Sequence, residues 1–268
     1  MKKTVIILIL LILCSTALFA GGEKPKQRYD IDGRDYYGPE IYDNKIFKYK
    51  QEKFDRKKER FHIMKTEQKD NETELEISVY DNNKIKEFSR EYTETDEGWI
   101  LSEAERFIWK TKDQLDKVDQ QIDPEKPLVL PWNVSMNFQA SYSLTFTKYI
   151  DEEKGTVTFT NIHDIRLTGR QQKEIFKQFF DVLVFEDNEI LKATTQKGEP
   201  YINKEFKTYY YYGKGRGLIY KEVFFNNKLH SFTVFKKYIS QDEFQTSEQP
   251  KECLIRPAPP TMEVVPSE

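Results

Sequence analysis

The sequence predicts an all-β protein in which one large antiparallel meander forms an open or half-closed barrel, with at most one short helix. Three observations lead to this prediction. Four alanines follow residue 20, while aromatic residues make up 14% of the chain, a balance that suits pleated sheets better than helix surfaces. Short runs of alternating apolar and polar residues recur along the chain. The gaps between these runs are too short for the crossovers that parallel strands need.

The segment Met1–Ala20 has the three regions of an export signal in the usual order. Lys2 and Lys3 precede an apolar run from Val5 to Cys14, and small residues follow up to Ala20. The run is shorter than the ~20 residues of a membrane-spanning helix. We therefore expect export to the periplasm or the extracellular medium, with cleavage after Ala20 or, as the alternative, after Ala17. No transmembrane segment is expected after the signal is removed.

A lipid anchor at Cys14 is the alternative to cleavage. The segment Leu11–Cys14 resembles the acylation box of bacterial lipoproteins, although Leu13 stands where that pattern has a small residue. Acylation would make the chain a lipid-anchored envelope protein. Loss of Cys14 with the signal would leave Cys253 as the one remaining cysteine, so no internal disulfide could form.

The mature chain is expected to have three parts. Residues 21–44 are predicted to be an extended polar arm because Gly33, Gly38 and Pro39 interrupt any period. Residues 45–240 are predicted to be a single antiparallel β domain. Residues 241–268 hold five prolines and are predicted to be a disordered acidic tail.

Charge is concentrated at the ends of the chain. Without Lys2 and Lys3 there are 40 basic and 45 acidic residues, a net charge of −5, of which the tail contributes −4. The predicted β domain is therefore nearly neutral and has no basic face. This balance excludes nucleic acid as an expected partner.

Twelve runs are predicted to be strands. They are 45–51, 60–67, 72–80, 84–93, 98–109, 135–149, 155–167, 173–185, 189–195, 205–212, 218–225 and 229–238. Turns rich in Asp and Asn are predicted between several of them, at 81–83, 151–154, 186–188 and 226–228.

One stretch supports two interpretations. Ser102–Glu105 fits a helix capping box, and apolar residues then recur near helical spacing as far as Ile122. The preferred interpretation continues a strand from Trp99 through Trp109 and leaves Thr111–Gln121 as one short helix or loop, because Phe107 to Trp109 are bulky and favour strands.

No catalytic or metal-binding residues are predicted. His62, His163 and His230 are far apart in sequence, and no His or Cys lies at ligand spacing. Gly213–Gly217 lies between two strand patterns, so it predicts a glycine-rich turn instead of a phosphate-binding loop, which would lead into a helix. The run Tyr209–Tyr212 places aromatic side chains on both faces of a strand, with core packing preferred and ligand lining as the alternative.

Four segments of the second half occur in an order that resembles a group of uncharacterised secreted bacterial β proteins, similar in style to lipoprotein-carrier half-barrels. They are Pro127–Pro131, Leu167–Gly169, Phe179–Val184 and Tyr211–Ile219. The resemblance implies a half-barrel fold and an envelope location. It implies no reaction, because such proteins have no established catalytic residues.

Together these features predict an exported, non-enzymatic envelope protein without a cofactor. A lipid-like ligand or an envelope protein would bind its concave face. The alternatives are an envelope hydrolase whose site is not visible in sequence, and a surface lipoprotein with a structural role. A fully packed interior would argue against ligand binding, whereas carboxylates clustered with His163 or His230 would favour a hydrolase.

Overall fold

The computed structural model describes residues 31–53, 56–69, 72–109 and 115–246. The predicted export signal, Cys14 and the residues from 247 onward lie outside these ranges, so what was predicted for them remains a prediction. Within the described ranges, no helix combines the length and the apolar character needed to cross a membrane.

The described residues form sixteen strands and three short helices. The first half contains β1 (Ile31–Asp32), α2 (Arg34–Tyr37), α3 (Pro39–Tyr42), β2 (Ile46–Lys53), β3 (Arg56–Lys69), β4 (Glu72–Tyr80), β5 (Lys86–Glu94), β6 (Gly98–Trp109), β7 (Leu115–Asp119) and β8 (Gln121–Asp123). The second half contains β9 (Leu128–Pro131), β10 (Asn133–Val134), β11 (Gln139–Asp151), β12 (Gly155–Ile175), β13 (Gln178–Thr195), β14 (Pro200–Gly213), β15 (Gly217–Phe225), β16 (Lys228–Ile239) and α4 (Gln241–Thr246).

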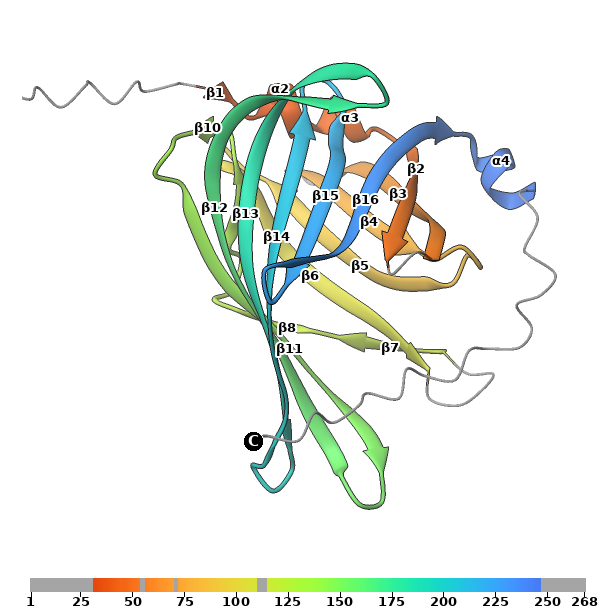
Figure 1. The fold of residues 1–268 in the computed structure, drawn as a ribbon, viewed down its shortest axis with the longest axis vertical. Coiled ribbons are helices and arrows are strands. Elements are labelled where there is room, and N and C mark those ends of the chain that lie inside the picture. Colours follow the sequence, from red (N-terminus) through yellow and green to blue (C-terminus); the bar gives the residue numbers. More distant parts are fainter. Residues whose placement is uncertain (1–30, 54–55, 70–71, 110–114, 247–268) are drawn as a thin grey trace, which may run out of the picture. The chain divides into compact units, whose positions relative to one another are not determined.

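Fourteen of these strands form one antiparallel sheet, nearly closed into a barrel with one seam, which confirms the predicted fold class (Figure 1). Strands β2 to β6 pair in chain order, and so do β11 to β16. These two meanders are joined edge to edge by β2 and β16, the first and last strands of the sheet. A separate two-stranded sheet pairs β1 with β10.

A single extended segment bridges the seam between β6 and β11. Its first part, β7, pairs with β6 from Trp109↔Leu115 to Glu105↔Asp119. The backbone N–H of Gln120 then donates to the carbonyl of Ala104 at 2.8 Å. Its last part, β8, pairs instead with β11. The segment therefore holds together two strands that do not pair with each other.

Side chains alternate between the barrel interior and the outside, as the period of a strand requires. In β4, Leu75, Ile77 and Val79 line the interior, and the intervening Glu76 and Ser78 face outward. This alternation is the reason that a sequence with 32% charged residues can still fill a barrel.

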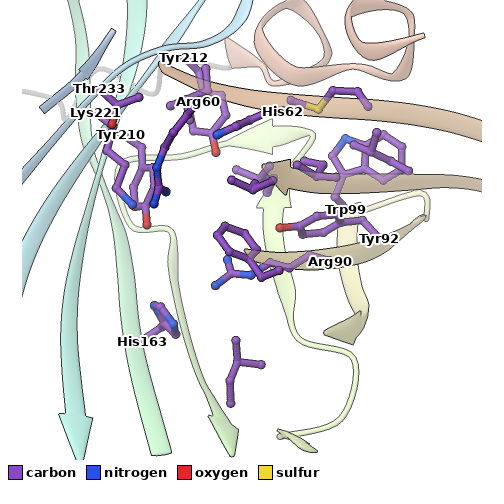
Figure 2. Close-up of a pocket in the computed structure, with 18 of the residues that line it drawn as sticks. Arg60, His62, Arg90, Tyr92, Trp99, His163, Tyr210, Tyr212, Lys221 and Thr233 are labelled. Atoms are coloured by element: carbon purple, nitrogen blue, oxygen red, sulfur yellow. The ribbon is translucent and has the colours of Figure 1, made fainter. Parts of the chain in front are cut away.

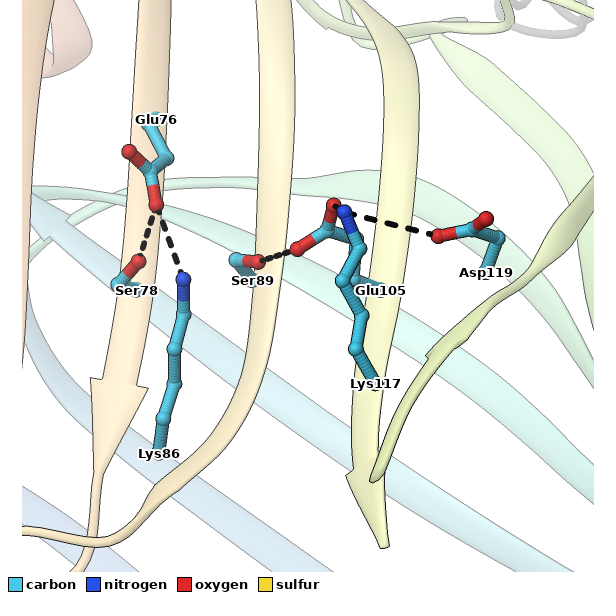
Figure 3. Close-up of polar contacts among 7 residues, drawn as sticks. All are labelled: Glu76, Ser78, Lys86, Ser89, Glu105, Lys117 and Asp119. Atoms are coloured by element: carbon cyan, nitrogen blue, oxygen red, sulfur yellow. Dashed lines mark hydrogen bonds and ion pairs between the residues drawn. The ribbon is translucent and has the colours of Figure 1, made fainter. Parts of the chain in front are cut away.

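The outer face of β4 to β7 carries a ladder of polar contacts (Figure 3). Lys86 Nζ lies 3.2 Å from Glu76 Oε1, and the Ser89 hydroxyl donates to Glu105 Oε2 at 2.8 Å. Lys117 forms an ion pair with Glu105 across β6 and β7. Each exposed pair contributes little by itself, but cross-strand pairs of opposite charge favour this register.

The described part of the predicted arm is not extended. Residues 34–42 form α2 and α3, two single helical turns that bury Tyr36, Tyr37 and Tyr42. Gly38, taken from sequence as an interruption, ends the first turn and begins the second, with Pro39 at the favoured first position. Tyr42 lines the interior of the barrel, so these turns cover one end of it (Figure 1). Burial of the aromatic rings outweighs the weak local helix preference.

The first residues of the predicted tail are also ordered. The Ser240 hydroxyl accepts the backbone N–H of Glu243 at 3.0 Å and so caps α4. Phe244 is buried, with its ring 5.3 Å from Phe61 and 5.6 Å from Tyr80. The prediction of disorder was therefore wrong for residues 241–246.

Most predicted strands are confirmed, and those at 72–80 and 98–109 have the predicted bounds. The short helix or loop predicted for 111–121 was wrong where the chain is described, because Leu115–Asp119 pairs with β6 as strand β7. The turn predicted at 186–188 was also wrong. The two strands predicted on either side of it are parts of a longer hairpin, which turns at Phe176 and Lys177.

Candidate functional site

The barrel encloses a cavity of about 310 Å³ (Figure 2). This size falls in the usual range of small-molecule sites, roughly 300–1,000 Å³. Strands from both meanders contribute to its wall, together with Tyr42 from α3. The interior is therefore not fully packed. A fully packed interior would have argued against ligand binding, and the structure does not have one.

One part of the cavity wall is apolar. It consists of aliphatic, thioether and aromatic side chains from β3 to β6 and from the strands that face them. The chief members are Met64, Leu75, Ile77, Trp99, Leu130 and Leu144. Trp99 is fully buried, and its indole N–H donates to the carbonyl of Tyr37 at 2.8 Å. That hydrogen bond satisfies the polar atom of the indole and leaves the ring as apolar surface.

The other lining is cationic. Four cations from four different strands line the cavity: Arg60, Arg90 and Lys221, which Figure 2 shows, and Arg106. Glu189 is the one carboxylate among the lining residues described. Adding Asp187, which lies beside this lining, and Glu87, the ion-pair partner of Arg60 at 2.6 Å, still leaves one positive charge in excess.

Three of these cations have no ion-pair partner in the part of the chain described. Lys221 Nζ lies 4.8 Å from the ring centre of Tyr210, and Arg106 lies 5.6 Å from that of Phe146. Arg90 has a similar, longer contact with Phe88. Aromatic faces stabilise a cation only partly, so the positive charge remains available to a ligand.

His62 also lines the cavity. Burial lowers the pKa of its imidazole to about 3, and the nearby charges of Arg60 and Lys221 act in the same direction. The ring packs against Tyr49 with centroids 4.4 Å apart. His62 is therefore neutral at physiological pH and adds no charge to the wall.

The polar end of the cavity contains a cluster around His163. This side chain is buried, with Nδ1 2.9 Å from Asp187 Oδ2, and its ring stacks on Tyr142 with centroids 4.8 Å apart. Asn161 Nδ2 lies 2.8 Å from Glu189 Oε1 and 3.1 Å from His163 Nε2. With its proton at Nδ1, the imidazole accepts from Asn161 Nδ2 at Nε2, and a histidine oriented by a carboxylate in this way occurs both in general bases and in metal ligands.

Sequence reasoning missed this cluster because it placed a turn at 186–188. In the structure His163 lies directly opposite Glu189 across β12 and β13, and Asp187 is two residues away on the same face. A hairpin centred on residues 176–177 would have placed residue 163 opposite 189 or 190. The cluster could therefore have been predicted if the turn had been placed at residues 176–177.

The other two histidines differ from His163. His62 lies among cations, while His230 lies near the rings of Phe206 and Phe225 at the end of the β15–β16 hairpin. The structure thus brings one of the three histidines together with two carboxylates and an asparagine, and does not bring the three histidines to one site.

The predicted alternation of the tyrosine run is confirmed. Tyr210 and Tyr212 line the cavity (Figure 2), whereas Tyr211 packs outside in a cluster with Val182, Val184 and Ile219. Burial raises the pKa of Tyr210 and Tyr212, so both keep their hydroxyl protons. Core packing is therefore confirmed for Tyr211, whereas ligand lining by Tyr210 and Tyr212 stays a prediction.

The glycine-rich segment forms the predicted turn. It connects β14 to β15, with Gly215 and Gly217 at φ values of +65° and +75°. At Gly217 a Cβ would lie 2.7 Å from the ring of Tyr42, which explains why glycine is needed there. The segment leads into a strand and so offers no helix N-terminus to an anion.

The fold and the cavity together define a nearly closed β-barrel with a partly apolar, partly cationic interior. No model of a protein family matches the sequence, and no curated protein sequence is detectably similar to it. Two solved structures are similar to this chain over 74% of its length, each with a TM-score of 0.44.

The first of these structures is a protein from Bacteroides fragilis, described as exported and as having a YmcC-like fold, with 9% identity and 96% of its own length covered. The second, from Parabacteroides distasonis, is described as a lipoprotein, with 13% identity and 95% of its length covered. Neither is described as a lipoprotein carrier. Because both TM-scores are below 0.5, these likenesses define neither a shared fold nor a shared function.

Proposed function

We propose that this is an exported, non-enzymatic protein that binds an anionic amphipathic small molecule inside its barrel. The observation that carries the proposal is the cavity, in which an apolar wall faces three cationic side chains without ion-pair partners in the described chain. Export is proposed from the segment Met1–Ala20, and incorporation of labelled palmitate would test acylation at Cys14.

The lining selects the class of ligand. Apolar surface from Trp99, Leu130 and their neighbours would bury a hydrocarbon or ring system, at roughly 25 cal/mol per Å² of apolar surface. A carboxylate or phosphate head group would give Arg90 and Lys221 the ion-pair partner that neither has in the described chain. A charge-assisted hydrogen bond to such a cation is about twice as strong as a neutral one. A cationic amphiphile would meet like charge and bind poorly.

The proposal is tested with four dodecyl probes that differ in the head group. Isothermal titration with dodecanoate, dodecyl phosphate, dodecanol and dodecyltrimethylammonium should show both anions binding at least tenfold more tightly than the alcohol, and no detectable binding of the cation. Equal affinity for the anions and the alcohol, or no binding of any probe, would overturn the proposal.

Matched variants locate the site. Arg90→Gln and Lys221→Gln each remove one cation from the cavity and should weaken dodecanoate binding about tenfold, which corresponds to ~1.4 kcal/mol. Lys192→Gln removes a cation from the exposed surface and should leave the affinity unchanged. Equal losses in all three variants would indicate a general charge effect instead of a site.

A hydrolase is the second candidate because His163 lies with Asp187 and Glu189 in the cavity. Asp187 would orient the imidazole so that Nε2 could act as a general base. Hydrolysis of 4-nitrophenyl acetate, 4-nitrophenyl butyrate or bis(4-nitrophenyl) phosphate that is lost in His163→Gln would support this function over simple binding. Rates equal to those of buffer would favour the non-enzymatic proposal.

A further inference from the structure

We infer that the polar end of the cavity is a site for a divalent transition metal such as Zn²⁺, held by His163, Glu189 and Asn161 and oriented by Asp187. Backbone pairing fixes these positions. His163 and Glu189 are opposite each other on β12 and β13, and Asn161 and Asp187 lie two residues away on the same inward face.

The geometry brings a ring nitrogen and a carboxylate oxygen to one point. Asn161 Nδ2 is within 3.1 Å of His163 Nε2 and within 2.8 Å of Glu189 Oε1, so both acceptors converge on one partly positive group. A cation held between these two acceptors would take the place of Asn161 Nδ2. The Asn161 side chain would have to withdraw, and rotation of its amide would then turn Oδ1 toward the cation as a third ligand.

A second observation points to a cation independently. Asp187 and Thr208 are opposite each other on β13 and β14 and are 1% and 0% exposed, yet Asp187 Oδ1 and Thr208 Oγ1 have no hydrogen-bond partner in the described structure. Asn161 Oδ1 is likewise buried and unpartnered. Asn161 and Asp187 both contact His163, and Thr208 lies opposite Asp187. Such buried oxygens are costly to leave unsatisfied, and a metal with its coordinated water would satisfy them.

The donor set fits the chemistry of a borderline metal ion. One imidazole nitrogen with carboxylate and amide oxygens is a mixed N/O set of the kind that binds Zn²⁺, at bond lengths of about 2.0–2.2 Å. One candidate ligand atom from each of His163, Asp187 and Glu189 lies within 4.8 Å of the others. Small side-chain rotations would bring the ligand atoms to bonding distance. The bond from His163 Nδ1 to Asp187 is the usual way in which a carboxylate orients a ligating histidine.

Neighbouring cations weaken the binding of a metal ion, so removing one of them gives a specific test of the metal site. Lys221 lines the same cavity, and burial lowers its pKa while the charges of Glu189 and Asp187 act in the opposite direction. A dication would compete with Lys221 for these carboxylates. Removing Lys221 should therefore tighten metal binding, although it should weaken binding of an anionic amphiphile.

The test is titration of the EDTA-stripped, purified protein with ZnCl₂ by calorimetry, with bound zinc counted by elemental analysis and Co²⁺ used as a spectroscopic probe. One equivalent should bind with a Kd in the micromolar range. Glu189→Gln, which preserves the side-chain shape, and His163→Gln should each weaken binding at least tenfold, while His230→Gln should leave it unchanged. Lys221→Met should tighten binding several-fold.

Two results would overturn the inference. The first is the absence of Zn²⁺ and Co²⁺ binding to the unaltered protein. The second is binding that persists in Glu189→Gln, with circular dichroism matching the parent protein. The amphiphile titration does not involve the metal, so the metal site and the proposed ligand-binding function can fail separately.

Discussion

The environment of His62 predicts a specific loss of stability in mild acid. Burial, with the charges of Arg60 and Lys221, lowers the pKa of its imidazole to about 3 in the folded protein, against about 6.5 in an unfolded chain. Between these two pKa values, His62 is protonated in the unfolded state and neutral in the folded state. The corresponding stability is present above pH ~6.5 and is lost progressively as the pH falls toward 3.

The size of the effect follows from the two pKa values. At pH 5 an unfolded His62 is almost fully protonated and a folded one almost fully neutral, so the difference is about 1.5 pH units, or about 2 kcal/mol at 1.36 kcal/mol per unit. Replacement by glutamine removes the ionisable group but keeps a neutral polar side chain. Between pH 7.5 and pH 5.0, the unfolding free energy of His62→Gln should therefore fall less than that of the parent protein, by about 2 kcal/mol.

The assay is urea unfolding followed by tryptophan fluorescence at both pH values. His230→Gln serves as the matched control, because the pKa of His230 is lowered less than that of His62, and it should change the pH dependence far less. An equal fall in unfolding free energy between pH 7.5 and pH 5.0 for the parent protein and for His62→Gln would refute the reasoning. That result would mean that His62 is solvated inside the cavity instead of held neutral by its surroundings.

Three further predictions concern packing and turns. Leu101→Ala should lower the unfolding free energy by about 2–5 kcal/mol in urea, because this side chain is fully buried, and a loss below about 1 kcal/mol would contradict that packing. Phe176→Asn combined with Lys177→Gly should raise the Tm, since these residues turn the hairpin with φ values of 51° and 63°, and a lower Tm would show that the parent side chains stabilise the tip. Tyr211→Phe should cost about 1 kcal/mol through its lost 2.7 Å hydrogen bond to Glu222, and unchanged stability would mean that the bond contributes nothing.

Local pattern was sufficient for the regular strands but not for the cavity. Strand β4 alternates polar and apolar residues from Glu74 to Val79, and its limits were predicted to the residue. Glu186, Asp187 and Asn188 favour a turn when taken alone. In the structure they continue strand β13, because Arg166 pairs with Glu186 at 2.7 Å and His163 bonds Asp187. Those partners are far away in the sequence, outside any local window.

The N-terminal segment shows the same limit for a different physical reason. Gly33, Gly38 and Pro39 do interrupt regular structure, and an extended arm followed naturally from them. The stability of α2 and α3 comes instead from tertiary burial, because Tyr37 packs against Trp132, Phe185 and Tyr212. A helix of four residues gains almost nothing from local propensity, so no sequence window could reveal it.

The pairing of β2 with β16 sets the order of events for a chain that folds while it is made from its N-terminal side. Strand β2 is available first, but its partner strand ends at Ile239, close to the last residue that the structure describes. Hairpins within each meander can form as they emerge, yet β2 cannot pair with β16 until residue 239 is present. Until then β2 keeps one edge of its backbone unpaired and open to other chains. Premature pairing of this edge with another chain is the hazard that this topology creates.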